Sequence, residues 1–368
     1  MTSEGIERLV RSDLANLGGY TPSKAPETVA EELGLRAEDI IKLDDNENPY
    51  GCSPRVQQAL GDCQYLFTYP DAGQTELRRQ LQEYTGVDAR CIVADNGSDQ
   101  LIDNVLRLFI EPGDEVINCI PTFDIFRFRA VIYGGRLVNV PREEDFAVNV
   151  SAVKAAISKK TKMIVLATPN NPTGTITPQR DILALADTGI PVLVDEAYVE
   201  FSGETATQFV SQYENMMVLR TFSKWAGLAG LRVGYGIFPP KIAEYLMKLK
   251  LPYNVSVAAR VAVQESLKDV DYLMGRVKAI VAERGRLFEE LKKLGFLKPF
   301  PSQANFIFCS VLKGEASEIQ RKLEQRGILV RYFDIPLMKN SIRISVGKPE
   351  HTDALLKALR EIGEEISG

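Results

Sequence analysis

The stretch Thr221-Phe222-Ser223-Lys224-Trp225-Ala226-Gly227-Leu228-Ala229-Gly230-Leu231-Arg232 follows directly on a short apolar run, residues 216–219. A lysine beside a buried strand is costly to keep charged, because desolvation favours the neutral amine. A neutral amine is a nucleophile suited to forming a Schiff base. The hydroxyls of Thr221 and Ser223 and the guanidinium of Arg232 are groups that bind phosphate. Lys224 and its neighbours therefore indicate a site for pyridoxal phosphate.

The composition bounds the class of protein. The chain has 368 residues, of which 45% are hydrophobic and 25% charged, as in a soluble globular protein large enough for two or three domains. Its net charge of -5 argues against a nucleic-acid-binding protein, whose surface normally carries basic patches. The acidic N-terminal segment does not resemble a signal peptide, and no apolar stretch approaches the roughly 20 residues that span a bilayer. We expect a cytoplasmic protein without nucleic-acid or membrane partners.

The cysteines and the single histidine limit the kinds of disulfide, metal and catalytic site that the chain can form. The five cysteines are scattered without a CxxC pair, which favours reduced thiols over a disulfide framework. The single histidine, His351, excludes a multi-histidine zinc site and argues against a Ser-His-Asp triad. It stands near the start of an expected terminal helix, where we expect a surface or capping residue. We expect no metal in the site.

Helical periodicity and short apolar runs alternate from about residue 74 onward. The expected helices are 74–84, 100–109 and 125–133, and the expected strands are 91–94, 115–119, 162–167, 192–195, 217–219 and 233–238. Near-continuous apolar strands separated by helices predict an α/β fold with a mostly parallel sheet covered on both faces. In such folds ligands bind beyond the carboxyl ends of the strands. The candidate residues fall at these ends.

The order of elements changes after a long helical region, 255–294, which has a possible break near Asp269 and Val270. The expected elements that follow are strand 305–310, helix 316–326, strands 328–332 and 341–346, and helix 352–366. We interpret residues 46–270 as a large cofactor-binding domain and residues 271–368 as a smaller α+β domain. Residues 1–45 are too few to fold alone. We expect them to form an arm that packs on the small domain or on a partner subunit.

A carboxylate and a tyrosine close another apolar strand. Asp195 follows the run 190–194 and precedes Tyr198 by three residues. A buried carboxylate needs a cationic partner, and the pyridine nitrogen of pyridoxal phosphate is such a group. Tyr198 could then donate to the phenolic oxygen of the same ring. The structural alternative is an N-cap aspartate and a packing tyrosine.

Polar residues also follow two further expected strands. Asn171 lies in the turn sequence Asn170-Asn171-Pro172-Thr173-Gly174, which turn chemistry alone would explain, but it could also reach the phenolic oxygen. Gly97, Ser98 and Asp99 open an expected helix, whose free N–H groups suit a phosphate. A plain helix cap is the alternative there.

The order of these motifs along the chain resembles that of the fold type I aminotransferases. Gly-Ser-Asp, Asn-Pro-Thr-Gly, Asp-x-Ala-Tyr and Ser-Lys, with an arginine eight residues after the lysine, extend the resemblance over roughly residues 40–350. The stretches 43–51 (Leu-Asp-Asp-Asn-Glu-Asn-Pro-Tyr-Gly), 69–71 (Tyr-Pro-Asp) and 341–347 (Ser-Ile-Arg-Ile-Ser-Val-Gly) are similar to the class II histidinol-phosphate aminotransferase family. The resemblance implies a large domain with its sheet between helices, and a smaller α+β C-terminal domain.

The resemblance also implies roles for matching residues. Lys224 would form the Schiff base with pyridoxal phosphate and carry the α-proton. Asp195 would pair with the pyridinium, while Asn171 and Tyr198 would hold the phenolic oxygen. Phe123 would stack on the ring. The remaining cofactor-binding residues would be Gly97, Ser98, Asp99, Thr221, Ser223, Arg232 and, from the neighbouring subunit of a homodimer, Tyr69.

The substrate implied by the resemblance is L-histidinol phosphate. Its transamination with 2-oxoglutarate would give imidazole acetol phosphate and glutamate, in histidine biosynthesis. Arg343 would bind the anionic group of the substrate, helped by Arg331, by Tyr20 from the arm and by Asn48. Two forked cations suit a phosphate, and one can serve the carboxylate of glutamate. The structural alternative gives both arginines internal ion pairs, for example with Asp334.

Other functions would use nearly the same residues. An aromatic amino acid aminotransferase and a phosphothreonine decarboxylase are alternatives within the same fold, and a non-catalytic pyridoxal-phosphate-binding regulator is an alternative from another class. The regulator is not favoured, because the sequence shows no basic DNA-binding segment. A dinucleotide-binding module fits less well, because Gly234-x-Gly236 is followed by Pro239. The chain departs from the family pattern at Trp225-Ala226, at Asp124 and at Asp45, where the family often has Ala.

Overall fold

The strands of the larger sheet are runs of Val, Ile, Leu and Met whose side chains alternate between two apolar cores. In β5 (Thr161–Ala167), Ile164 and Leu166 enter one core, whereas Met163 and Val165 enter the other. This alternation follows from the period of two in a strand, which points successive side chains to opposite faces. The computed structural model describes residues 5–15, 17 and 23–367.

Seven strands form the larger sheet, in the order β2-β8-β7-β6-β5-β3-β4. Neighbouring strands are parallel except at β8, which is antiparallel to both β2 and β7. The α/β fold with a mostly parallel sheet is therefore confirmed. The other strands are β2 (Ile92–Asp95), β3 (Glu115–Ile120), β4 (Arg136–Pro141), β6 (Val192–Asp195), β7 (Met216–Thr221) and β8 (Gly234–Ile237).

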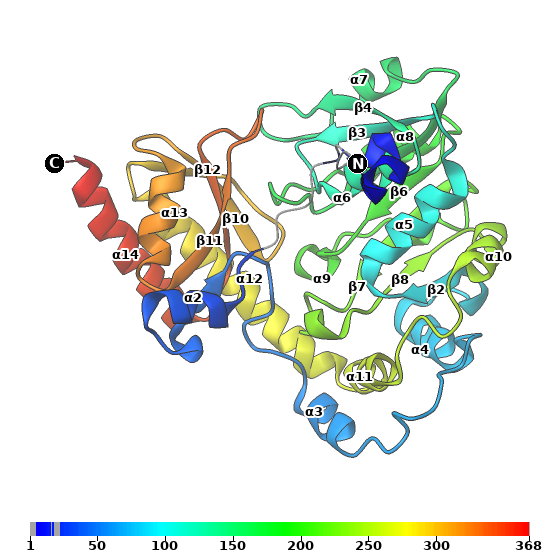
Figure 1. Cartoon of the computed structure of the whole chain (residues 1–368), viewed down its shortest axis with the longest axis horizontal. Helices are drawn as coiled ribbons and strands as arrows, with labels where there is room; N and C mark the ends of the chain where they lie inside the picture. The colour runs from blue at the N-terminus through cyan, green and yellow to red at the C-terminus, as the bar shows by residue number, and fades with distance from the viewer. Residues whose placement is uncertain (1–4, 16, 18–22, 368) are drawn as a thin grey trace.

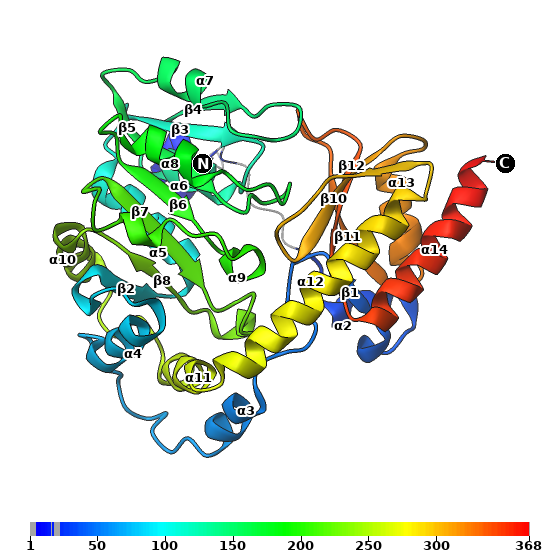
Figure 2. The ribbon, with the colours of Figure 1, turned by 180° about the vertical axis from the view of Figure 1, so that it is seen from behind.

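Helices cover both faces of this sheet (Figures 1 and 2). One core contains side chains from α5 (Gly97–Phe109), α6 (Ile125–Ile132) and α10 (Pro240–Leu249). The other contains side chains from α3 (Pro54–Gly61), α4 (Thr75–Thr85), α7 (Val150–Ala155), α8 (Gln179–Ala186), α9 (Val199–Ser202) and α11 (Val257–Leu267). Burial on both faces explains why the central strands read as continuous apolar runs.

A second sheet of five strands has the order β1-β11-β12-β10-β9. Its first strand comes from near the N-terminus and pairs in parallel with β11. The strands are β1 (Ile41–Leu43), β9 (Leu297–Pro299), β10 (Phe306–Val311), β11 (Ile328–Phe333) and β12 (Ser341–Ser345), and α2 (Pro26–Leu33), α13 (Ala316–Glu324) and α14 (Pro349–Ser367) lie beside them (Figure 1). The division of the chain at residues 45 and 270 stays a prediction.

The expected break in the long helical region is confirmed. α11 ends at Leu267, and α12 (Val270–Lys292) begins after Asp269, which is its N-cap residue. α12 runs from the helices of the larger sheet to the smaller sheet (Figure 2). Its inner face is buried from Leu273 to Leu291, so one continuous helix packs in both halves of the molecule.

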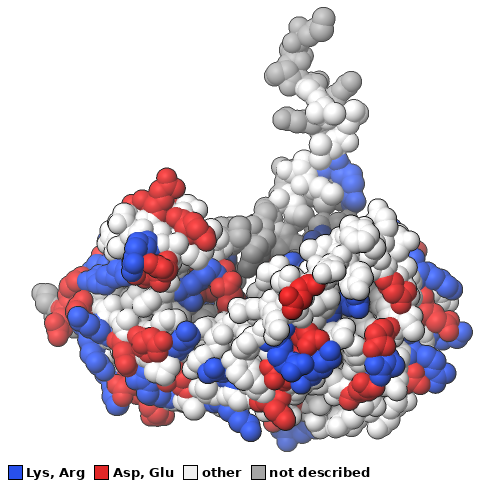
Figure 3. Space-filling view, turned by 90° about the horizontal axis from the view of Figure 1, so that it is seen from below, with Lys and Arg blue, Asp and Glu red and all other residues white. Residues whose placement is uncertain are grey.

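The surface carries charges of both signs. Acidic and basic side chains alternate over the face seen in Figure 3. In the same view the segment with the 3₁₀ turn Ile6–Leu9 and α1 (Ser12–Ala15) stands away from the body. Among the residues described, no helix is both long and apolar enough to cross a bilayer. All five cysteines are free thiols.

Gly227 provides a test of how tightly the Lys224 loop packs. Its φ is +67°, and a Cβ there would lie 2.3 Å from the carbonyl oxygen of Gly51. We expect Gly227→Ala to lower the free energy of unfolding by about 2–5 kcal/mol, because left-handed backbone costs about 1–2 kcal/mol and overpacking about 1–3 kcal/mol. Urea unfolding followed by circular dichroism measures the loss. Gly230→Ala is the control, since a Cβ at Gly230 meets no atom within 4 Å; equal losses would contradict the steric explanation.

Candidate active site

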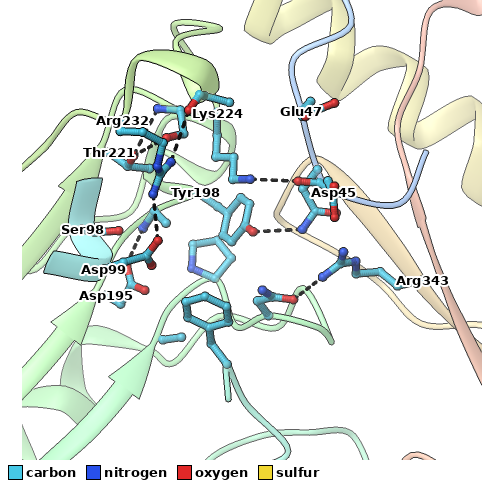
Figure 4. Close-up of a pocket in the computed structure, with 18 of the residues that line it drawn as sticks. Asp45, Glu47, Ser98, Asp99, Asp195, Tyr198, Thr221, Lys224, Arg232 and Arg343 are labelled. Atoms are coloured by element: carbon cyan, nitrogen blue, oxygen red, sulfur yellow. Dashed lines mark hydrogen bonds and ion pairs between the residues drawn. The ribbon is translucent and has the colours of Figure 1, made fainter. Parts of the chain in front are cut away.

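A cavity of about 370 Å³ lies beyond the carboxyl ends of the parallel strands, between the two sheets (Figure 4). β5, β6 and β7 each deliver residues to it at or just after their last position, and β12 of the smaller sheet closes it from the opposite side. The predicted residues that line this cavity are Ser98, Asp99, Phe123, Asn171, Asp195, Tyr198, Thr221, Ser223, Lys224, Arg232 and Arg343. Segments distant in sequence therefore meet at the edge where this fold class binds ligands.

Lys224 follows β7 and extends into the cavity (Figure 4). Its Nζ donates a hydrogen bond to the backbone carbonyl oxygen of Asp45 at 2.9 Å. Burial lowers the pKa of Lys224 to about 8, and the positive charge of Arg343 acts in the same direction. Because an ordinary lysine titrates near pH 10.4, this amine has a far larger neutral fraction at neutral pH. The site therefore holds a nucleophilic amine.

Asp195 is the last residue of β6 and is only 5% exposed. Burial raises its pKa to about 7, and the nearby charge of Asp99 adds to the effect. Its Oδ1 accepts a hydrogen bond from the backbone N–H of Ala197 at 3.1 Å. The next helix, α9, begins after Tyr198 as its N-cap, so Asp195 does not cap it. A cation that entered beside this carboxylate would restore its charged form.

One corner of the cavity gathers hydroxyl and guanidinium groups. The hydroxyl of Thr221 donates to Ser223 Oγ at 3.0 Å, and Arg232 Nη2 donates to Asp99 Oδ2 at 2.9 Å. Ser98 belongs to the first turn of α5, where backbone N–H groups lack helical partners. This combination of donors suits a phosphate.

Two glycines bring the backbone close around this corner. Gly97 has a φ of +76°, and a Cβ there would lie 2.8 Å from Arg232 Nη2. A Cβ at Gly234, on β8, would lie 2.6 Å from the backbone N of Ser98. Any side chain at either position would therefore displace a phosphate-binding group. The antiparallel strand β8 thus packs directly against the start of α5.

Arg343 projects from β12 into the cavity (Figure 4). Its Nη1 donates to Asn171 Oδ1 at 2.6 Å, and its Nη2 donates to the backbone carbonyl oxygen of Asp44. The guanidinium carbon lies 5.3 Å from the centre of the Phe306 ring. Arg343 is only 7% exposed, so an anion that reached it would bind in a water-poor environment.

Some predicted residues lie elsewhere. Tyr69 is 81% exposed and stacks on Tyr253, with ring centres 4.6 Å apart, outside the cavity of the same protomer. Asn48 does not line the cavity, because its Nδ2 donates to the backbone oxygen of Trp225 at 2.9 Å. Arg331 lines a neighbouring pocket, and its Nη1 donates to Ser23 Oγ at 3.4 Å. Tyr20 lies outside the described residues. The roles of these residues stay predictions.

Three polar residues that line the cavity were not predicted from the sequence: Asp45, Asn46 and Glu47. The segment follows β1, whose Lys42 has its Nζ 2.5 Å from an Asp45 carboxylate oxygen and 3.2 Å from one of Glu47. The signal was present, since the stretch 43–51 carried part of the resemblance, but only Asn48 was selected from it.

The arrangement fits pyridoxal phosphate. Asp195 is a carboxylate whose pKa is raised by burial, and a pyridine nitrogen could pair with it. Lys224, an amine whose pKa is lowered by burial, lines the same cavity. Phe123 provides an apolar ring in the wall, held edge-on against Phe126 with ring centres 6.3 Å apart. The phosphate corner provides a helix start, hydroxyls and Arg232. Each polar part of the cofactor therefore has a complementary group.

Comparison with known proteins gives one family. The profile described as aminotransferase class I and II matches residues 38–359. The histidinol-phosphate aminotransferase of Dehalococcoides mccartyi is 54% identical over 359 residues, which cover 98% of this chain and 99% of that protein. The chloroplastic histidinol-phosphate aminotransferase of Nicotiana tabacum is 45% identical over 357 residues, covering 96% and 86%. The crystal structure of histidinol-phosphate aminotransferase from Sinorhizobium meliloti in complex with pyridoxal-5'-phosphate has a TM-score of 0.85 at 27% identity, covering 96% and 97%.

The lowered pKa of Lys224 predicts that its reactivity rises and levels off at a lower pH than that of an ordinary lysine. In cofactor-depleted protein, we expect reductive methylation of Lys224 to accelerate about tenfold per pH unit up to pH 8 and then to level off, because only the neutral amine reacts. Quantitative mass spectrometry of the digest measures the rate. Lys241, whose side chain is 82% exposed, is the reference in the same sample. Coincident profiles for the two lysines would contradict the prediction.

Proposed function

The chain belongs to the class I and II aminotransferase family, and we propose that it transfers the amino group of L-histidinol phosphate to 2-oxoglutarate. The products are imidazole acetol phosphate and glutamate, in a step of histidine biosynthesis. The observation that carries the proposal is a cavity with Lys224 and Asp195 on one side and the buried Arg343 on the other. Histidinol-phosphate aminotransferases that share 54% and 45% identity with nearly the whole chain support it.

The cofactor is pyridoxal phosphate, which when bound supplies an aldehyde carbon and an electron-withdrawing ring. Lys224 would hold it through Nζ, and Asp195 would hold the pyridine nitrogen. Asn171 and Tyr198 would contact the phenolic oxygen, and Phe123 the ring face. The residues that would hold the phosphate are Gly97, Ser98, Thr221, Ser223 and Arg232, with Asp99 orienting Arg232 through their ion pair.

Lys224 is suited to move the α-proton of the substrate. With a pKa near 8, its amine can accept a proton from the α-carbon and then return it to a neighbouring carbon atom. A general base works best when its pKa lies near the working pH. The burial that lowers this pKa also keeps water from competing for the proton.

Arg343 would anchor the anionic end of either substrate. Histidinol phosphate has no α-carboxylate, so its phosphate is the group that a forked cation can bind. 2-Oxoglutarate offers a carboxylate to the same guanidinium. Arg331, in the neighbouring pocket with Ser23 and Asp44, would be the second cation for the dianion. One cavity could then accept both substrates in turn.

A homodimer is part of the proposal. Tyr65, Leu66, Phe67 and Tyr69 form a run of side chains between 63% and 87% exposed, which is unusual for large apolar residues close together. The protruding N-terminal segment adds exposed residues, including Ile6 at 81% and Leu9 at 75%. We propose that a second copy covers these surfaces and receives Tyr69 at its phosphate corner. A cytoplasmic location is consistent with the five free thiols.

An amino-donor panel tests the function. Purified protein with 2-oxoglutarate should use histidinol phosphate in preference to Phe, Tyr and Asp, and Lys224→Ala should abolish turnover. We expect Arg343→Ala to lower kcat/KM for histidinol phosphate by about 100-fold or more, because a charge-assisted anchor is lost, while cofactor affinity changes little. Preference for an aromatic donor would contradict the substrate. Release of the carboxyl carbon from phosphothreonine would indicate a decarboxylase instead.

A mixed dimer tests the shared site. Tyr69→Ala and Lys224→Ala homodimers should both be weak or inactive, whereas a hybrid of the two should recover about half of the wild-type activity, because one of its two sites would then be intact. Tandem affinity tags isolate the hybrid for assay. Tyr245→Ala is the control, since Tyr245 is 52% exposed but lies on α10, outside the exposed run. A hybrid as inactive as both parents would contradict the exchange of Tyr69.

A further inference from the structure

Asn46 is almost fully buried, at 2% exposure, and has a left-handed φ of +55°. We infer that Asn46 is a positioning residue that sets the direction in which Tyr198 donates its hydroxyl hydrogen, and that Ser345 fixes the orientation of Asn46. The inference rests on the proposed function, in which Tyr198 contacts the phenolic oxygen of the cofactor. Asn46 forms hydrogen bonds with Tyr198, with Ser345 at the end of β12, and with Asn305, the residue before β10.

The hydrogen bonds around Asn46 run in one direction. The backbone N–H of Asn46 donates to Ser345 Oγ at 2.9 Å, so the serine must use its own hydrogen elsewhere. That hydroxyl donates to Asn46 Oδ1 at 3.0 Å. The Nδ2 of Asn46 then donates to the hydroxyl oxygen of Tyr198 at 2.9 Å. The chain of donors thus leads from the backbone of residue 46 to the phenol.

Ser345 favours one orientation of the amide. If the amide of Asn46 were reversed, its NH₂ would face Ser345 Oγ, the serine hydrogen would lose Oδ1 as its acceptor, and Oδ1 would face Tyr198. The phenol would then donate to Asn46. In the observed orientation it accepts from Asn46 instead and keeps its hydrogen for another acceptor.

The ring of Tyr198 is held in place, so Asn46 acts on the direction of the O–H and not on the position of the ring. Tyr198 is 5% exposed, packs edge-on against Phe306 with ring centres 5.1 Å apart, and lines the cavity (Figure 4). A hydroxyl that accepts a hydrogen bond also becomes a stronger donor, because chains of hydrogen bonds polarise one another. Asn46 therefore both directs and strengthens the donor that Tyr198 offers to the cavity.

The conformation of residue 46 explains why asparagine is suited to this position. A left-handed φ disfavours most side chains but is tolerated by asparagine. Asn305 supports the same backbone by donating from its Nδ2 to the carbonyl oxygen of Asn46 at 2.9 Å. Asn305 thus contributes to the stability of the turn without touching the amide that contacts Tyr198, and it provides a matched control.

The test compares two ligands on cofactor-depleted protein. Dissociation constants are measured by fluorescence titration for pyridoxal phosphate and for an analogue that lacks the phenolic oxygen. The wild type should prefer the complete cofactor. Asn46→Asp has no N–H to give, so Tyr198 would donate to it and turn away from the cavity; we expect about a tenfold loss of preference. Ser345→Ala, which frees the amide to rotate, should lose part of the preference and provides a second variant if Asn46→Asp does not fold.

The control variants separate this inference from the proposed function. Asn305→Ala should keep the wild-type preference even if it weakens the binding of both ligands. Tyr198→Phe should lose the preference; if it keeps it, the proposed contact of Tyr198 with the cofactor is wrong. If Tyr198→Phe loses the preference but Asn46→Asp and Ser345→Ala keep it, the positioning role of Asn46 is overturned. A loss in Asn305→Ala equal to that in Asn46→Asp would also overturn it.

Discussion

The burial of the Asp195 carboxylate is the constraint on which the site depends. β6 ends at Asp195 inside the molecule, where desolvation raises its pKa to about 7. Lys224, after the neighbouring strand β7, is pushed in the opposite direction, to about 8. The pKa values of a carboxylate and an amine in one cavity are thus both shifted toward the neutral form. The carboxylate can pair with a cationic ring nitrogen, and the amine can react with an aldehyde.

The central strands could be predicted from sequence because local pattern decides them. β5, β6 and β7 are apolar along their whole length, as burial on both faces requires, and β6 matches its predicted bounds of 192–195. β4 was missed because it lies at the edge of the sheet and alternates with exposed residues such as Arg136 and Asn139. The three-residue strand β1 depends on a partner far along the chain, β11, and β9 is too short to show a pattern of its own. The antiparallel direction of β8 is set by how it packs between β2 and β7, which no local pattern reveals.

In the candidate site, too, some residues could be predicted from local sequence and others only from the folded structure. Lys224, Asp195 and Asn171 stand at or shortly after the ends of strands, so sequence order alone predicted that they would meet, and all three line the cavity. Asn46 could not be selected in this way, because its importance comes from contacts with Ser345 and Tyr198, 299 and 152 residues away. Residues that bind a ligand leave motifs in the sequence, whereas residues that orient them depend on the folded arrangement of distant segments.

The contacts of residues 44 and 45 have a consequence for how ligands enter. The backbone carbonyl oxygen of Asp45 holds Lys224, and that of Asp44 holds Arg343. A ligand that takes either cation replaces one oxygen partner by another, so its gain is the difference between two hydrogen bonds. The released carbonyl must then find a new donor. Because both carbonyls belong to adjacent residues, we expect an exchange at Lys224 to affect the hydrogen bond that Arg343 makes, and the reverse.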